Sequence, residues 1–304
     1  MNSNICNNCG GTYEHRHGRW ICASCGSYKP ENLSSEQENL LIPAFQNLRL
    51  AEFEKAENEF NDLIERYPEV ADGYWGRLLA HNSITYEIDE NGKTIPTCHG
   101  DEIRKITHTE DFKNALKYAD ESMKAFYTAQ AEYIDRTHEE WATKASKEDP
   151  YDVFISYKES ENGERTADSI AAQELYLHLT KRGYRVFYSR ESLRDKVGEK
   201  YEPYIFHAVS TAKVMIVYGS KPEYIESTWI KNEWKRFSKS IQAKKKPEGS
   251  LIVACDGFPP EELPHELAAK QCLDAKQKSF FSDLDNAVDQ IGRASCRERV
   301  FGDV

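Results

Sequence analysis

The pattern of apolar and polar positions changes twice along the 304 residues of the chain. Residues 1–30 hold too few apolar side chains to bury a core of their own. From Ser34 to about Lys147, apolar residues recur at steps of three and four, which predicts amphipathic helices. From Tyr151 onward, short continuous apolar runs alternate with helix-length amphipathic stretches. We therefore predict a multidomain chain with parts at residues 1–30, 31–148 and 149–290.

Within the segment 31–148, the helix that ends before Pro68 and the helix that follows it resemble a tetratricopeptide repeat. The features that carry this resemblance are a small residue, an aromatic residue, a closing proline and a tryptophan early in the next helix, namely Ala56, Phe60, Pro68 and Trp75. Residues 86–109 break the helical period and predict a loop or short hairpin. Because so few repeats are present, we favour an all-α packing scaffold, with a groove for a protein partner as the alternative.

Residues 149–290 are predicted to form an α/β domain with a parallel sheet covered on both faces. The predicted strands are Tyr151–Tyr157, Arg185–Tyr188, Val214–Tyr218 and Leu251–Cys255. The predicted helices are Ala167–Arg182, Tyr201–Thr211 and Thr228–Ile241. Ligands of such sheets bind outside the carboxyl ends of the strands. Ser156, Tyr157 and Lys158 follow or end the first strand, so we expect them to line one crevice.

Four of the eight cysteines lie in the first 25 residues, as two Cys-x-x-Cys pairs. Cys6, Cys9, Cys22 and Cys25 have the spacing of a structural zinc ribbon, in which each turn aims two thiolates at one ion. Two disulfides are the alternative and require an oxidising compartment. The N-terminus shows no charged and apolar stretch typical of a secretory signal, so we predict Zn²⁺ and a cytoplasmic protein.

The charge composition limits the classes of partner that the chain is expected to bind. The chain has 40 Lys plus Arg and 51 Asp plus Glu, for a net charge of −11. This balance argues against broad nucleic-acid binding, which depends on neutralising phosphates. No apolar run reaches the roughly 20 residues that a membrane-spanning helix needs, so we expect no membrane partner. A local basic site for one nucleotide remains compatible with these numbers.

Three sequence boxes in the α/β part resemble those of Toll/interleukin-1 receptor (TIR) domains. They are Asp152 to Lys158, Phe187 through Gly198, and Ser220-x3-Tyr224-x2-Ser227-x-Trp229-x3-Glu233. The second box departs from the family because Ser189 stands where many members have an acidic residue. The resemblance implies a flavodoxin-like α/β fold. A zinc ribbon and a tetratricopeptide-like segment ahead of it resemble a bacterial arrangement.

The resemblance also implies a reaction, which is cleavage of NAD⁺ at the nicotinamide–ribose bond to give ADP-ribose or a cyclic variant. Glu233 occupies the position of the catalytic carboxylate. Trp229 lies four residues earlier on the predicted helix, on the same face, where it would wall the nicotinamide ribose. Lys158 would pair with the pyrophosphate, and Ser156, Tyr157 and Tyr224 complete the expected substrate-binding set.

Each of these residues also has a structural interpretation. Glu233 lies among Lys231, Lys235 and Lys239, where a glutamate is usually a solvated ion-pair partner. TIR domains also act as adaptors that self-associate through the second-box loop, here Ser189–Lys200. In that alternative the chain is a non-catalytic scaffold. The two functions are compatible, because TIR glycohydrolases often need self-association to complete their site. A bacterial defence role, antiphage or stress-related, fits the enzyme.

Residues 291–304 stand apart from the rest of the sequence. They show no apolar periodicity and resemble the in-frame translation of a sequencing-library adapter. We therefore predict a non-native tail and leave these residues out of the fold argument.

Overall fold

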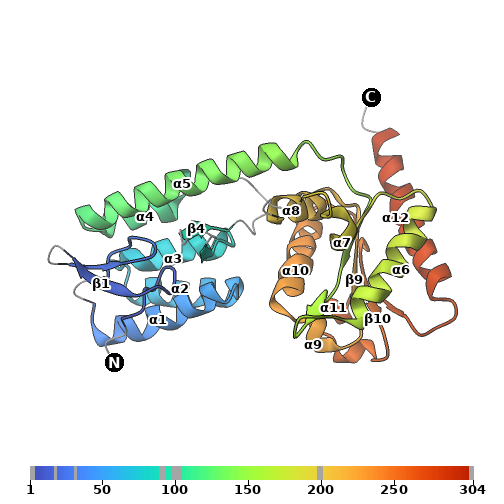
Figure 1. The fold of residues 1–304 in the computed structure, drawn as a ribbon, viewed down its shortest axis with the longest axis horizontal. Helices are drawn as coiled ribbons and strands as arrows, with labels where there is room; N and C mark the ends of the chain where they lie inside the picture. The colour runs from blue at the N-terminus through green and yellow to red at the C-terminus, as the bar shows by residue number, and fades with distance from the viewer. Residues whose placement is uncertain are drawn as a thin grey trace. The chain divides into compact units, whose positions relative to one another are not determined.

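The computed structural model describes residues 4–16, 19–30, 33–88, 94–97, 105–196 and 201–300. The chain divides into two compact units, Met1–Lys144 and Ala145–Val304. The first unit is mainly helical, and the second is built around a five-stranded parallel sheet (Figure 1). A helical segment thus precedes an α/β part, as the hydrophobic pattern predicts.

The first unit starts with a small antiparallel hairpin and continues mainly as helices. Its elements are β1 (Tyr13–Arg16), β2 (Arg19–Cys22), α1 (Ser35–Arg49), α2 (Phe53–Arg66), α3 (Ala71–His81), β3 (Tyr86–Ile88), β4 (Thr94–Pro96), a short 3-10 helix (Ile106–His108), α4 (Glu110–Tyr118) and α5 (Glu121–Ala145). Strands β3 and β4 pair antiparallel, which confirms the short hairpin predicted within residues 86–109.

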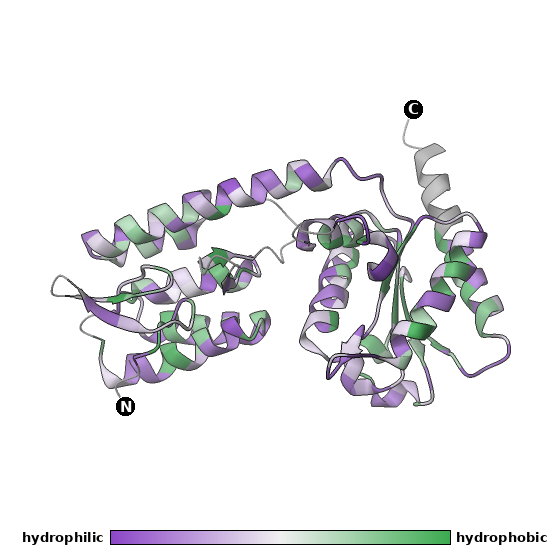
Figure 2. Cartoon of the chain, viewed as in Figure 1, coloured by the Kyte–Doolittle hydropathy of each residue, from purple (hydrophilic) through white to green (hydrophobic). Residues whose placement is uncertain are grey.

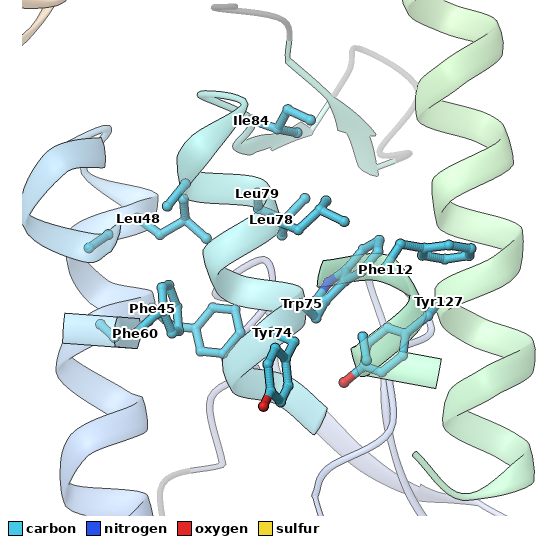
Figure 3. Packing of buried hydrophobic residues seen from close by; sticks show 14 of the residues in the cluster. Phe45, Leu48, Phe60, Tyr74, Trp75, Leu78, Leu79, Ile84, Phe112 and Tyr127 are labelled. Carbon is cyan, nitrogen blue, oxygen red and sulfur yellow. The ribbon is translucent and has the colours of Figure 1, made fainter. Parts of the chain in front are cut away.

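Aromatic side chains form the core of the helical unit (Figure 3). Phe45 and Phe60 meet edge to face with ring centroids 5.0 Å apart, and Trp75 stacks on Tyr127 at 4.8 Å. Helix α3 approaches α2 so closely that a Cβ added at Gly76 would lie 2.2 Å from the Phe60 ring. The predicted apolar stripe of α2 is therefore the face on which α1 and α3 pack.

The second unit alternates strands and helices. Its elements are β5 (Val153–Ser156), β6 (Ser160–Glu161), β7 (Glu164–Arg165), α6 (Ala167–Lys181), β8 (Val186–Phe187), α7 (Ser189–Ser192), α8 (Glu202–Thr211), β9 (Val214–Gly219), α9 (Pro222–Ile225), α10 (Thr228–Gln242), β10 (Leu251–Cys255), a 3-10 helix (Pro260–Glu262), α11 (His265–Ala268), β11 (Gln271–Asp274) and α12 (Phe280–Val300).

The five parallel strands of the main sheet lie in the order β11-β10-β9-β5-β8. Numbered along the chain, this is the order 2-1-3-4-5 of a flavodoxin-like sheet, and the strand order reverses at β5. Ligand sites of such folds lie outside the carboxyl ends of the strands at this reversal. Residues that follow β5 therefore lie where a ligand site is expected in such a fold.

Side chains of alternate strand positions enter two separate apolar layers. Phe154 and Val253 face a layer that contains Trp234 of α10, whereas Val153 and Ile252 face a layer built with α6 and α12. Figure 2 shows the central strands in the colour of hydrophobic residues and the surrounding helices in both colours. Burial on both faces explains why these strands are continuous apolar runs in the sequence.

Strand β11 is the element of this sheet that the sequence does not predict. It is an edge strand of four residues with half-buried or exposed side chains, so it lacks a continuous apolar run. Helix α12 extends to Val300, and Ile291, where the predicted tail begins, is buried in the α6–α12 layer. Within the described part of the chain, every helix is too short or too polar to span a membrane.

Candidate functional site

A cavity of about 310 Å³ lies at the carboxyl end of β5. Its walls come from the segments that follow β5 and β8 and from helices α8 and α10. The lining residues that bear on chemistry are Tyr157, Lys158, Glu159, Ser189, Ser227, Trp229 and Glu233. Four predicted site residues are thus brought together at the edge of the sheet where the strand order reverses.

Glu233 is buried at this cavity, with 7% of its surface exposed. Its Oε2 accepts a hydrogen bond of 2.5 Å from the Ser156 hydroxyl, and its Oε1 accepts one of 2.6 Å from the Trp229 indole nitrogen. The structure therefore joins three predicted site residues in one contact network. This burial does not fit a solvated partner for the neighbouring lysines.

Helix α10 places the carboxylate through its amphipathic pattern. It begins after Ser227, whose hydroxyl donates to the Tyr224 carbonyl at 2.8 Å. Ile230, Trp234 and Phe237 are fully buried against the sheet, which fixes the rotation of the helix about its axis. Glu233 precedes Trp234 and lies four residues after Trp229, so one turn of α10 brings the indole and the carboxylate together.

Burial raises the pKa of Glu233 from its ordinary value to about 7. The hydrogen bonds from Ser156 and Trp229 and the charge of Arg236 act in the opposite direction and lower this pKa. A carboxyl group with a pKa near neutrality exists in both protonation states at physiological pH. Such a group in a cavity is a functional-site candidate on physical grounds.

A second hydrogen-bond network occupies the side of the cavity next to β8. The Tyr157 hydroxyl donates to Glu159 at 2.6 Å and is hydrogen-bonded with Ser189 at 2.5 Å. Arg190 forms an ion pair of 2.5 Å with the same Glu159 carboxylate. The start of the second-box loop is thus tied directly to the segment that follows β5.

Lys158 lines the cavity, and its backbone carbonyl accepts a hydrogen bond from Thr166, the residue that caps α6. Tyr224 is absent from the residues that line the cavity. Its hydroxyl donates instead to Glu161 at 2.7 Å, and Lys221 donates to it at 3.2 Å. The geometry gives Tyr224 a role in holding α9 against the β6–β7 hairpin.

Four polar residues line the cavity without having been predicted as site residues, namely Glu159, Ser160, Ser189 and Ser227. Glu159 directly follows the first box, so its place at the cavity could have been predicted from its position beside Lys158. Ser189 is visible in the sequence only as a departure from an acidic residue. Its hydrogen bond with Tyr157 joins residues 32 positions apart, which no local pattern reveals.

The four N-terminal cysteines form a candidate metal centre. Their sulfur atoms all lie within 4.8 Å of one another, and the Cys6–Cys25 and Cys9–Cys22 sulfurs are 3.7 and 3.5 Å apart. Thiolates at about 2.3 Å from a tetrahedral zinc are separated by about 3.8 Å, so the spacing fits that ion. Gly10 and Gly26 adopt positive φ after each pair, as the two turns require.

Polar contacts join the cysteine cluster to the helical core within the first unit. Asn8 donates to the Cys25 sulfur at 3.6 Å, and its side-chain oxygen accepts a bond of 3.2 Å from the Trp75 indole nitrogen. Arg49 of α1 donates to the Asn7 carbonyl at 2.6 Å. The turn between Cys6 and Cys9 is therefore packed on the helices.

Comparison with known families agrees with the geometry of the second unit. Residues 153–291 match a family model described as TIR domain. No curated protein matches the chain. The α/β unit of this chain therefore contains a TIR domain, preceded by a helical segment and a four-cysteine cluster compatible with a zinc ribbon.

Proposed function

We propose that the chain is an NAD⁺ glycohydrolase that cleaves the bond between nicotinamide and ribose. The observation that carries this proposal is the buried Glu233 carboxylate, which faces a cavity at the carboxyl end of β5 and is held by Ser156 and Trp229. Some TIR domains hydrolyse NAD⁺, and Glu233 has the motif position of their catalytic glutamate. A solvated glutamate has no need of such an arrangement.

The reaction has modest chemical requirements. The C1′–N bond breaks and its electron pair leaves with nicotinamide, which departs as a neutral base, so no acid is needed at the leaving group. Positive charge develops on the ribose, as in glycoside hydrolysis. The ionised carboxylate of Glu233 stabilises that charge and accepts hydrogen bonds from ribose hydroxyls. Water then adds to C1′ and loses a proton to give ADP-ribose, or a group of the substrate adds to give a cyclic product.

The other lining residues have complementary roles in this proposal. Lys158 pairs with the pyrophosphate, and the Trp229 ring, 41% exposed at the cavity, walls the nicotinamide ribose. Tyr157 shapes the wall of the cavity, and Ser156 acts through its hydrogen bond to Glu233. A cavity of about 310 Å³ is at the lower end of the range for small-molecule sites. It suits the nicotinamide–ribose end of the substrate, with the remainder extending along the surface.

We further propose that self-association through the TIR domain completes the site. The loop Ser189–Lys200 is the proposed contact, of which residues 197–200 lie outside the described part of the chain. Its described start is bonded to the cavity through Ser189 and Arg190. Assembly at this loop would therefore act directly on Tyr157 and Glu159.

The four-cysteine cluster is proposed to hold a structural Zn²⁺, bound by Cys6, Cys9, Cys22 and Cys25. Zinc held by thiolates fits a reducing compartment, so we propose a cytoplasmic location. The helical segment would receive a protein partner or serve as a scaffold for the ribbon. We also propose a role in bacterial defence or stress signalling, with depletion of NAD⁺ as its output.

The test of this proposal is chromatography of an NAD⁺ reaction with purified full-length protein, beside the Glu233→Ala variant. We expect nicotinamide with ADP-ribose or a cyclic product from the wild type only, and a rate that rises with protein concentration. Equal release by both proteins would contradict the role of Glu233. No release by either, in a self-associated sample, would favour a TIR adaptor.

A further inference from the structure

We propose that the Trp229 indole N–H and the Ser156 hydroxyl are positioning groups for Glu233, which together orient its carboxylate and hold it ionised. The kinetic consequence rests on the proposed function, whereas the effect on Glu233 itself does not. In this assignment Trp229 acts through its nitrogen in addition to its ring. This role does not require Trp229 or Ser156 to contact the C1′–N bond that breaks.

The two donors come from different elements and address different oxygens. Ser156 ends β5 and bonds Oε2 at 2.5 Å, and Trp229 in the first turn of α10 bonds Oε1 at 2.6 Å. A carboxylate held at both oxygens by groups on a strand and a helix cannot rotate without breaking one bond. The plane of the Glu233 carboxylate is therefore set before any substrate enters.

The two positions differ in exposure, which makes their contributions separable. Ser156 is 1% exposed, so water cannot replace its hydroxyl when that group is removed. Trp229 is 41% exposed, so its substitution disturbs little packing. Trp141 of α5 (Glu121–Ala145) offers the comparison, because it is a half-buried tryptophan of the first unit, whereas Glu233 belongs to the second.

Hydrogen bonds to an ionised carboxylate favour that form, whereas burial disfavours it. Other ionisable groups line the cavity or lie on the two helices that contribute to its walls. Tyr157, Lys158 and Glu159 line it, Glu202 and His207 lie on α8, and Lys231, Lys235, Arg236 and Lys239 lie on α10. Arg236 is among the groups that lower the pKa of Glu233. The hydrogen bonds from Ser156 and Trp229 also lower this pKa, and they do so without adding charge to the cavity.

The experiment compares Trp229→Phe and Ser156→Ala with the wild type and with Trp141→Phe. The Glu233 side-chain carboxyl is followed by ¹³C NMR during a pH titration of the full chain, and its signal is assigned by its loss in Glu233→Gln. We expect the midpoint to rise by about one pH unit in Trp229→Phe and in Ser156→Ala, and to stay unchanged in Trp141→Phe. Thermal melting confirms that each variant is folded.

The same proteins are assayed for nicotinamide release as a function of pH. With Glu233 needed in its ionised form, a midpoint one unit higher lowers kcat at pH 7 roughly fivefold, and activity recovers at higher pH. Because Phe keeps an aromatic ring, a ring-only role predicts an unchanged profile. Unchanged Glu233 titration in both variants would overturn the proposal. Absence of nicotinamide release by the wild type counts against the proposed function alone, since the titration needs no substrate.

Discussion

The indole nitrogen of Trp75 donates a hydrogen bond of 3.2 Å to the side chain of Asn8, which lies between two cysteines of the N-terminal cluster. Trp75 is 1% exposed and stacks on Tyr127 in the centre of the helical core. Asn8 also donates to the Cys25 sulfur. A buried amide thus links the cysteine cluster to the helical core.

This link predicts that removing the metal loosens the helices. We expect a strong chelator to reduce helical circular dichroism and to lower the melting temperature of residues 1–144, because metal binding supplies folding free energy to the ribbon. Asn8→Ala leaves the Trp75 N–H buried without its acceptor and should cost about 1–3 kcal/mol. Zinc affinity should fall roughly tenfold in the same variant.

The control for that experiment is Asn7→Ala, which keeps the backbone carbonyl that Arg49 contacts. Competition with a chromogenic chelator measures zinc affinity, and circular dichroism measures helicity. Helices that keep their full signal and melting temperature after complete metal removal would contradict the link.

The close approach of α3 to α2 predicts strong sensitivity at Gly76. A methyl group there would lie 2.2 Å from the Phe60 ring, which is fully buried and has little room to move. We expect Gly76→Ala to destabilise the first unit by about 3 kcal/mol. Gly73→Ala on the same helix places its methyl 3.1 Å from Ile64, so its cost should be much smaller. Denaturant unfolding of both variants decides this, and equal stabilities would be inconsistent with the packing.

The raised pKa of Glu233 predicts how the stability of the fold changes with pH. Its folded-state pKa of about 7 lies above the roughly 4.3 of an unfolded glutamate. Between these two pH values the native state therefore holds a proton that the unfolded state has lost. Stability therefore falls as pH rises from about 4 to 7. Glu233→Gln removes this ionisation and should raise stability by about 2–3 kcal/mol at pH 8 and by little at pH 4. A stability difference independent of pH would refute the assignment.

Lys158 is predicted to act on substrate binding rather than on the chemical step. Lys158 lines the cavity, and its proposed pairing with the pyrophosphate would be worth about 1.5 kcal/mol or more. Lys158→Ala should raise KM for NAD⁺ roughly tenfold and change kcat little, with an effect that weakens at high salt. Lys181→Ala, at the far end of α6, serves as the control. A fall in kcat with an unchanged KM would speak against this role.

The strands and helices that bury a whole face could be predicted from the sequence. Continuous apolar runs at β5, β9 and β10 reflect burial on both sides of the sheet, and the stripes of α2 and α10 reflect one buried face. Edge strand β11 could not be predicted, because its side chains are half-buried or exposed and form no apolar run.

The candidate site was predictable where its residues share one local element. Trp229 and Glu233 are one helical turn apart, so their pairing follows from spacing alone. The contact of Ser156 with Glu233 spans 77 positions and depends on the order of strands and helices. Tyr224 belongs to the same motif as Glu233, yet the turn at α9 directs its hydroxyl to Glu161. Motif membership therefore does not determine which side chains reach the cavity.

The most direct test of the central claim is the rate of nicotinamide release from NAD⁺ by the full-length chain and by its Glu233→Gln variant. Glutamine keeps the shape of the side chain but cannot carry the negative charge that stabilises the ribose cation. Glu226→Gln, an exposed change just before α10, is the matched control. The account predicts a loss of at least about 100-fold in Glu233→Gln and none in Glu226→Gln. Equal rates for Glu233→Gln and the wild type would contradict it.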